Sequence, residues 1–462
     1  MLPVCSLRRG RGRRIAILAF ALGVSCYVWL HIAREAALAR AQAEVAPADN
    51  KVVVLEREID SPPCSDGQAT LEDLALKKRI EAELAADVPA YRLTLRDHRT
   101  VKGRIVAETP TQIKFREGSG YSDYIVSVYP RSEIAAITGL PTPSMEVTRQ
   151  DVLLVKEFPG YHFVKNGPYS VVTDAPYAEV DQTLRVLTQL RQQFQQRFAP
   201  LIRDRDSGKI VQIVLFDSEA PFRACARRLA PALVESAGFY SSADNRLVLL
   251  NQMATTQFAK VQERIDQRLR ALDASDNQSE NRIQASAHLE ALSSQITTEA
   301  KSMTDRLTRH EGAHQLFRAF GIQCKFAIEP TWLTEGLAEY CETPEIGAYH
   351  SVLAERLAAV RDAGALLPLN VLLNHRDHSG FFSLGTANVE KAYEESWALT
   401  YFLMQRQYHD RFFEFVKYYR DINDVNTAAA AQEADGEVLL AAFLQTDVSV
   451  LEAQWQKFVN HM

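Results

Sequence analysis

The chain has 462 residues, which exceeds one ordinary domain and leaves ample length for a buried core, so two or three folded units are expected. A hydrophobic content of 47% and a charged content of 24% are typical of a globular protein. The formal net charge of -6 gives no sign of nucleic-acid binding, because affinity for phosphates depends on clustered Lys and Arg. Six cysteines are too few for a disulfide scaffold.

The N-terminal segment, residues 1–40, carries a basic cluster from Arg8 to Arg14 and then an uncharged apolar run from Ile15 to Ala33. The run is long enough to cross a bilayer as a helix, and arginines before a span favour a cytoplasmic N-terminus. We therefore expect a single-pass signal anchor with everything after Arg34 outside the cytoplasm, in the periplasm if the cell is Gram-negative. The main alternative is a cleaved signal peptide, for which residues 37–39 form a small-residue site.

Four cysteines, Cys64, Cys225, Cys324 and Cys341, would then lie in an oxidising compartment. Cys324 and Cys341 flank the motif segment described below. A disulfide between these two residues and a pair of buried free thiols are both open alternatives.

Three segments precede the motif region. Residues 41–88 are rich in Ala and Glu and predict a helical spacer and linker. Residues 89–140 alternate in short runs separated by turn residues, which predicts about five strands. This pattern resembles small SH3-like or Sm-like β-barrels, for which a packing or spacing role is the simplest interpretation. Residues 139–150 are expected to be a linker.

The rest of the chain mixes strands and helices. Residues 152–252 show the order strand, helix, strand, helix, strand, which predicts an α/β subdomain. Residues 253–307 carry apolar side chains at alternating spacings of three and four, which predicts a helical hairpin arm with a structural role. Residues 308–462 read as a mainly helical subdomain whose amphipathic helices pack around one core.

A metal-binding pattern opens this last segment at "HEGAHQLF". Residues four apart lie on one face of a helix, so His310 and His314 can present imidazole nitrogens to a single ion. Glu311 follows the first histidine and can point to the side of the ion where water would bind. This is the HExxH arrangement of two zinc ligands and a proton-accepting carboxylate.

A third ligand is available downstream in "PTWLTEGLAEYCE", residues 330–342. Glu335 and Glu339 are again four apart, so one carboxylate can bind the metal while the other accepts an N–H from a ligand histidine. Catalytic zinc commonly uses two His and one Glu, with water in the fourth position. Zn²⁺ is therefore the expected cofactor.

The combination of "HEGAHQLF" and "WLTEGLAEY" resembles the gluzincin metallopeptidases, including the aminopeptidase N group. The resemblance covers roughly residues 160 to 460 and implies that Glu335 is the third ligand and Glu339 a second-shell residue. It also implies a gluzincin (thermolysin-like) catalytic domain with an α/β subdomain and a mainly helical subdomain. Together with the membrane anchor and the small SH3-like β-barrel expected above, this gives an α+β fold.

A further match falls on "AYEESWALTYFL", where Tyr393 corresponds to the family tyrosine that stabilises the oxyanion. Glu395 and Ser396 replace the family's Lys and Gly at this helix. The family's upstream "GxMEN" segment, which holds a free substrate amine, has no counterpart before His310. The resemblance therefore favours an endopeptidase or processing enzyme over an aminopeptidase.

A loop carries two more histidines, His375 and His378. They are interpreted as solvated loop residues, with a transition-state donor as the alternative. We also expect an extended peptide to pair with the edge of the "NRLVLLNQ" strand, residues 245–252.

The sequence thus predicts a zinc peptidase of the cell envelope that acts on peptide or protein substrates, with no nucleic-acid partner. Two alternatives keep the same metal site. One is a catalytically idle zinc-containing scaffold that binds partners through the barrel or the helical arm. The other is a zinc hydrolase of non-peptide amides or esters.

Overall fold

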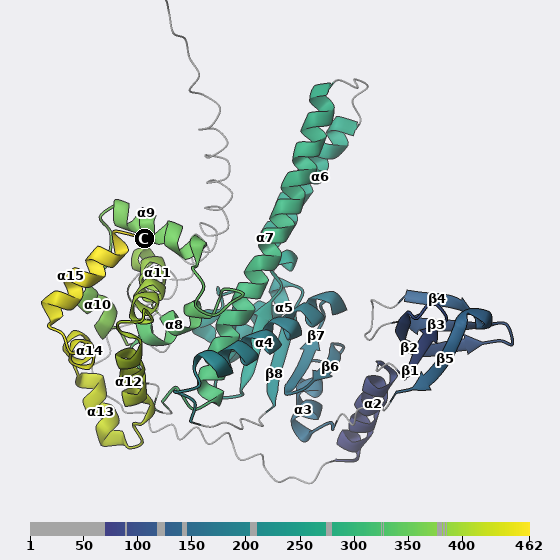
Figure 1. Cartoon of the computed structure of the whole chain (residues 1–462), viewed down its shortest axis with the longest axis horizontal. Helices are drawn as coiled ribbons and strands as arrows, with labels where there is room; N and C mark the ends of the chain where they lie inside the picture. Colours follow the sequence, from purple (N-terminus) through teal and green to yellow (C-terminus); the bar gives the residue numbers. More distant parts are fainter. Residues whose placement is uncertain are drawn as a thin grey trace, which may run out of the picture.

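The computed structural model describes residues 70–87, 90–117, 125–140, 146–203, 210–273, 280–324, 326, 328–376, 381, 384 and 386–462. The predicted membrane span from Ile15 to Ala33 and Cys64 lie outside these residues. Among the described helices, none has both the length and the hydropathy that crossing a bilayer requires. The described part of the chain is a mixed α+β structure with two sheets and many helices (Figure 1).

The first sheet contains five antiparallel strands in the order β4-β3-β2-β1-β5. Its small core is formed by Leu93, Ile113 and Phe115, because these side chains alternate with exposed ones along their strands. A short 3₁₀ helix, η1 (Arg131–Glu133), joins the last two strands. The strands are β1 (Tyr91–Leu95), β2 (Thr100–Glu108), β3 (Gln112–Glu117), β4 (Ile125–Pro130) and β5 (Ile134–Gly139).

The second sheet has the order β6-β7-β8-β10-β9. Strands β7, β8 and β10 are parallel, and β6 and β9 are antiparallel strands at the two edges. The expected peptide-pairing strand, β10, is therefore interior, and β9 is the edge strand beside it, which corrects the sequence expectation. The strands are β6 (His162–Asn166), β7 (Tyr169–Thr173), β8 (Val211–Phe216), β9 (Gly238–Ser241) and β10 (Arg246–Leu250).

Both faces of the second sheet are covered, which explains its nearly continuous apolar strands. On one face, Ile213 and Leu247 pack with Leu184 of α4 (Tyr177–Arg197) and Leu307 of α7 (Glu280–Ala319). On the other face, alternate strand residues pack with α3 (Arg149–Glu157) and α5 (Glu219–Leu229), which is followed by η2 (Pro231–Leu233). A second 3₁₀ turn, η3 (Gln252–Ala254), follows β10.

The segment expected to be a spacer contains α2 (Leu71–Asp87), and this helix is part of a core. Ile80 and Leu84 are 1% and 5% exposed and pack in the same cluster as α3 and the second sheet. The segment is helical as expected, but one face of the helix covers the α/β subdomain.

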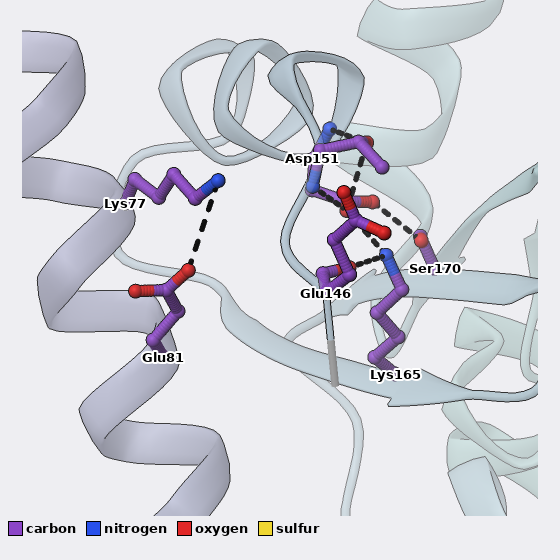
Figure 2. A network of polar contacts seen from close by, with 7 residues as sticks. Lys77, Glu81, Glu146, Asp151, Lys165 and Ser170 are labelled. Carbon is purple, nitrogen blue, oxygen red and sulfur yellow. Dashed lines mark hydrogen bonds and ion pairs between the residues drawn. The ribbon is translucent and has the colours of Figure 1, made fainter. Parts of the chain in front are cut away.

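A polar network fixes the start of α3 against the second sheet (Figure 2). Thr148 caps the helix through Asp151, whose buried carboxylate also accepts hydrogen bonds from Ser170 and from Lys165 at 2.5 Å each. Lys165 donates a further hydrogen bond to the Glu146 carbonyl at 2.7 Å. Because a buried charge is tolerated only when it is paired, this network specifies how α3 meets the β6–β7 hairpin.

The helical arm and the motif helix are one structure. Helix α6 (Thr256–Asp273) packs against the first half of α7, and the pair projects away from the body of the molecule (Figure 1). Gln262 and Ser293 exchange hydrogen bonds across this pair. Helix α7 runs without a break for 40 residues, from the arm through the motif segment. The expected boundary between residues 307 and 308 therefore falls inside a continuous helix.

The remaining helices form the largest core, which includes Phe317 of α7, Trp332, Trp397 and Trp455. The helices after α7 are α8 (Thr331–Tyr340), α9 (Ser351–Asp362), α10 (Leu369–Asn374), α11 (Thr386–Leu403), α12 (His409–Arg420), α13 (Val425–Glu433), α14 (Gly436–Leu444) and α15 (Val448–Val459). Helices α8 and α11 cross at Gly336, where an added Cβ would collide with the Ser396 carbonyl.

Three cysteines, Cys225, Cys324 and Cys341, lie within the described residues. They are buried, and none of them forms a disulfide with another. Of the two alternatives for Cys324 and Cys341, the structure has the buried thiols rather than the disulfide.

The α8–α11 crossing generates a prediction about packing. Gly336→Ala should lower the free energy of unfolding by about 1–3 kcal/mol, because the methyl group must displace the backbone of α11. Thermal unfolding followed by circular dichroism measures the change. Gly139→Ala is the control because a Cβ there meets no neighbour. A loss of equal size at both positions would contradict the crossing described here.

The buried Glu395 on α11 generates a prediction about pH. Burial raises its pKa to about 7, although its carboxylate accepts the Leu367 N–H at 2.8 Å. Because the folded-state pKa lies above the unfolded value, this residue's contribution to stability is full below about pH 4.5 and is lost as the pH rises through about 7. Glu395→Gln should therefore become more stable relative to wild type at higher pH, by about 2 kcal/mol between pH 5 and pH 8.

Urea unfolding followed by tryptophan fluorescence measures this difference, since Trp332, Trp397 and Trp455 belong to the same core. The exposed Glu452 on α15 supplies the control variant Glu452→Gln. A stability difference for Glu395→Gln that does not change with pH would show that the buried carboxyl does not titrate in this range.

Candidate metal centre

Helices α7 and α8 bring the predicted ligands together. His310 and His314 lie one turn apart on α7, and Glu335 lies on α8. One donor atom from each of these three residues lies within 4.8 Å of the other two. The side chains of His310, His314 and Glu335 are 14%, 16% and 14% exposed, so the group is largely shielded from solvent.

The distances between the donor atoms fit a metal ion. The two Nε2 atoms of His310 and His314 lie 3.2 Å apart, and Glu335 Oε2 lies 3.3 Å from the first and 3.5 Å from the second. Tetrahedral coordination with bonds of 2.0–2.1 Å places ligand atoms about 3.3–3.4 Å apart. The three predicted ligands therefore form a group that could hold a metal ion, with one tetrahedral position left for solvent.

The charges of the group are mutually dependent. Burial alone would lower the pKa of His310, but hydrogen bonds with Glu335 and Glu342 raise it well above the ordinary value. Burial would raise the pKa of Glu335, but His314 and His310 lower it strongly. A carboxylate and a positive charge therefore stabilise each other here, and a metal ion could take the place of the proton.

Glu311 lies beside this group on α7 and is 9% exposed. Burial raises the pKa of its carboxyl, while the neighbouring His310 and His314 and the Tyr240 N–H oppose this increase. Tyr240 belongs to the edge strand β9. Glu311 thus lies beside the predicted ligands and contacts the edge strand of the sheet. A buried carboxyl with a raised pKa suits the role of a proton acceptor.

The carboxylate next to His310 is Glu342 rather than the expected Glu339. Nδ1 of His310 lies 2.9 Å from Glu342 Oε1. The other oxygen, Oε2, lies 3.1 Å from Nε2 of His350. Helix α8 ends at Tyr340, and the turn that follows carries Glu342 back to the histidine.

Glu339 is buried in the same region, at 4% exposure. Its Oε2 atom has no hydrogen-bond partner among the described residues. Burial, and then the charge of Glu342, raise its pKa well above the ordinary value. Its predicted hydrogen bond to a ligand histidine is thus absent from the described contacts.

Two other candidate residues, Tyr393 and His375, contact the same aromatic ring. Tyr393 on α11 contacts Phe381 edge to face, with ring centroids 5.1 Å apart. His375 contacts the same phenyl ring from 5.3 Å, and its carbonyl accepts the Thr331 N–H at the start of α8. His378 lies outside the described residues. A role for Tyr393 at the metal centre stays a prediction.

Local packing explains how α7 is held. A Cβ on Gly312 would approach Leu187 and Leu190 of α4 to 2.7 Å and 2.9 Å, so the glycine of the motif allows the two helices to pack closely. The buried Arg309 donates hydrogen bonds to the Cys341 carbonyl at 2.7 Å and to Gln193 at 2.8 Å. These contacts fix α7 against α4 and against the end of α8.

Sequence reasoning missed Glu342, His350 and Arg309. One signal was available for Glu342, because a residue seven positions after Glu335 lies on the same face of a continued helix. His350 is separated from the motif by a loop and carries no local signal. Arg309 was hidden because an arginine before a metal motif normally reads as an exposed residue.

Comparison with known proteins adds one finding. Residues 307–425 match a family described as a protein of unknown function (DUF1570). This range contains the three predicted ligands, Glu311, Glu342 and α11. No curated protein matches the chain significantly.

The donor group generates a prediction about metal binding and pH. The protein should bind one Zn²⁺, and His314→Ala should weaken binding at least about 100-fold because it removes a ligand. Apparent affinity should fall by about tenfold for each pH unit below neutrality, since the raised pKa of His310 lets a proton compete with the metal.

Competition titration against a chromophoric chelator at several pH values tests both statements. His288→Ala is the matched control, because His288 is an exposed histidine on the same helix. Equal Zn²⁺ affinity of wild type and His314→Ala would show that His310, His314 and Glu335 do not form the metal site.

Proposed function

We propose that this chain is a zinc-dependent peptidase of the gluzincin type, an endopeptidase or processing protease of the cell envelope. The observation that supports this best is the tetrahedral spacing of His310, His314 and Glu335 beside the buried Glu311. The proposal includes a fold assignment: the second sheet and the helices from α7 onward form a thermolysin-like catalytic domain. The sheet of residues 91–139 is assigned as an SH3-like module.

Zinc bound to this group would acidify a water molecule and polarise the substrate carbonyl. Glu311 accepts the proton of the attacking water and later delivers it to the leaving amine. Its raised pKa suits both steps, because a carboxyl that is too acidic would hold the proton poorly. The Tyr240 N–H donates a hydrogen bond to the Glu311 carboxylate, which favours its ionised form against the effect of burial.

Strand β9 offers a seat for an extended peptide. It is an edge strand, and its pairing with β10 leaves the backbone groups of Gly238 and the carbonyl of Tyr240 directed away from the sheet, whereas the Tyr240 N–H donates to Glu311. Helix α7 packs against this strand, so a peptide added here would run past Glu311. A substrate with a regular backbone fits this edge better than a small amide or ester does.

Two further assignments complete the proposal. Tyr393 donates a hydrogen bond to the developing oxyanion, which requires its hydroxyl to reach the substrate from α11. The predicted anchor from Ile15 to Ala33 holds the catalytic domain on the outer side of the membrane. The first sheet and the arm of α6 and α7 are surfaces for protein partners.

The decisive test is Glu311→Gln in the full-length protein. The variant should retain zinc, because Glu311 is not one of the three donors, and should lose at least about 100-fold in peptide hydrolysis. Metal content by mass spectrometry and digestion of a peptide library measure the two properties. Glu290→Gln, on an exposed position of the same helix, should behave as wild type.

Two outcomes would contradict the proposal. Full hydrolysis by Glu311→Gln would exclude this residue as the base. Zinc binding by the wild type without hydrolysis of any peptide would favour the scaffold alternative, especially if the variant also preserves the cellular function.

A further inference from the structure

The connection between α8 and α9 forms a closed loop at the metal centre. Glu342 at its start and His350 at its end meet at 3.1 Å. The loop is also tied to α4, because Gln193 donates to the Pro344 carbonyl at 2.8 Å and accepts the Ile346 N–H at 3.3 Å. Arg309 holds the Cys341 carbonyl directly before Glu342. The position of Glu342 is therefore set by contacts outside the metal group.

The tautomer of His350 follows from its place at the start of α9. Its Nδ1 accepts the Leu353 N–H as the N-cap of the helix, so the ring proton lies on Nε2. Nε2 then donates to Glu342 Oε2. His350 is 3% exposed, so water does not compete freely for this hydrogen bond.

The same reasoning extends to His310. With Glu342 Oε2 engaged by His350, Oε1 accepts the N–H on Nδ1 of His310 at 2.9 Å. A proton on Nδ1 leaves Nε2 as the lone-pair atom, and Nε2 is the atom that faces His314 and Glu335. The chain of contacts from His350 through Glu342 thus selects the tautomer of His310 that can bind a metal.

We propose that Glu342 and His350 are the positioning residues of the metal centre, and that they link the N-terminus of α9 to metal affinity. This inference rests on the proposed metal-binding function. It assigns the role expected of Glu339 to a residue beyond the end of α8. Substituting a carboxylate that orients a ligand histidine typically lowers metal affinity 10- to 100-fold.

Glu339 and Glu342 form a matched pair for the test. Both are glutamates near His310 that are largely shielded from solvent, but Glu342 contacts the histidine and Glu339 Oε2 has no hydrogen-bond partner among the described residues. Replacing either by Gln removes one carboxyl at nearly constant volume. In Glu342→Gln the amide oxygen can accept from only one histidine, and the amide N–H₂ then faces the N–H of the other.

The experiment measures Zn²⁺ affinity of the full-length protein by chelator competition, together with the visible spectrum of the Co²⁺-substituted protein. Glu342→Gln should raise the Kd for Zn²⁺ by about 10- to 100-fold and alter the Co²⁺ bands. His350→Ala should have a smaller effect in the same direction, and Glu339→Gln should change the Kd less than threefold. Thermal unfolding of the metal-free variants identifies any loss of folding.

The outcomes separate this inference from the function on which it rests. If wild type binds Zn²⁺ and the two glutamate variants weaken binding equally, the positioning role is overturned while the metal centre stands. If wild type binds no metal, both fail. Should Glu342→Gln not fold, His350→Ala carries the test, and an unchanged Kd and spectrum for that variant overturn the inference.

Discussion

The structure depends on compensating the negative charge of four glutamates that lie at the junction of α7 and α8. Glu311, Glu335, Glu339 and Glu342 lie close to His310 and are largely shielded from water. Carboxylates at such positions are costly unless a cation or a set of donors stabilises them. The pKa values of Glu335 and Glu342 are lowered by histidines against the opposing effect of burial, whereas burial raises those of Glu311 and Glu339. The site thus lowers the pKa of two of the carboxyl groups around His310 and raises the pKa of the other two.

This charge arrangement needs a rigid scaffold, which the surrounding packing supplies. Gly312 lets α7 pack closely on α4, Gly336 lets α8 pack closely on α11, and Arg309 joins α7 to the end of α8. Each of these packing residues is a sequence neighbour of a predicted site residue. Gly312 follows Glu311, Gly336 follows Glu335, and Arg309 precedes His310. Errors in these crossings would separate the imidazoles from Glu335, and the uncompensated charge would then destabilise the core itself.

Local spacing accounts for the part of the site that was predictable. His310 and His314 share one face of a helix in any fold, so their pairing needed no tertiary information. Spacing alone left Glu335 and Glu339 open as the third ligand, and the resemblance to the gluzincin pattern selected Glu335. Glu342 could not be placed in this way, because its contact depends on the turn after Tyr340 and on how a distant His350 caps α9.

The same limit applies to the fold. Alternating and helical patterns indicated both sheets and the arm. The order of strands in a sheet depends on contacts between residues distant in sequence, so the prediction took β10 for an edge strand although β9 pairs with its outer side. The burial of Ile80 on α2 also depends on which surface the helix meets.

The donor set also narrows the kind of metal that the centre would accept. Two imidazole nitrogens disfavour Mg²⁺ and Ca²⁺, which prefer oxygen ligands. A thiolate would favour softer ions, but the buried Cys341 contributes no donor atom to the group. Two imidazole nitrogens and one carboxylate oxygen are donors that suit zinc, which is the ion that the proposed hydrolytic function requires.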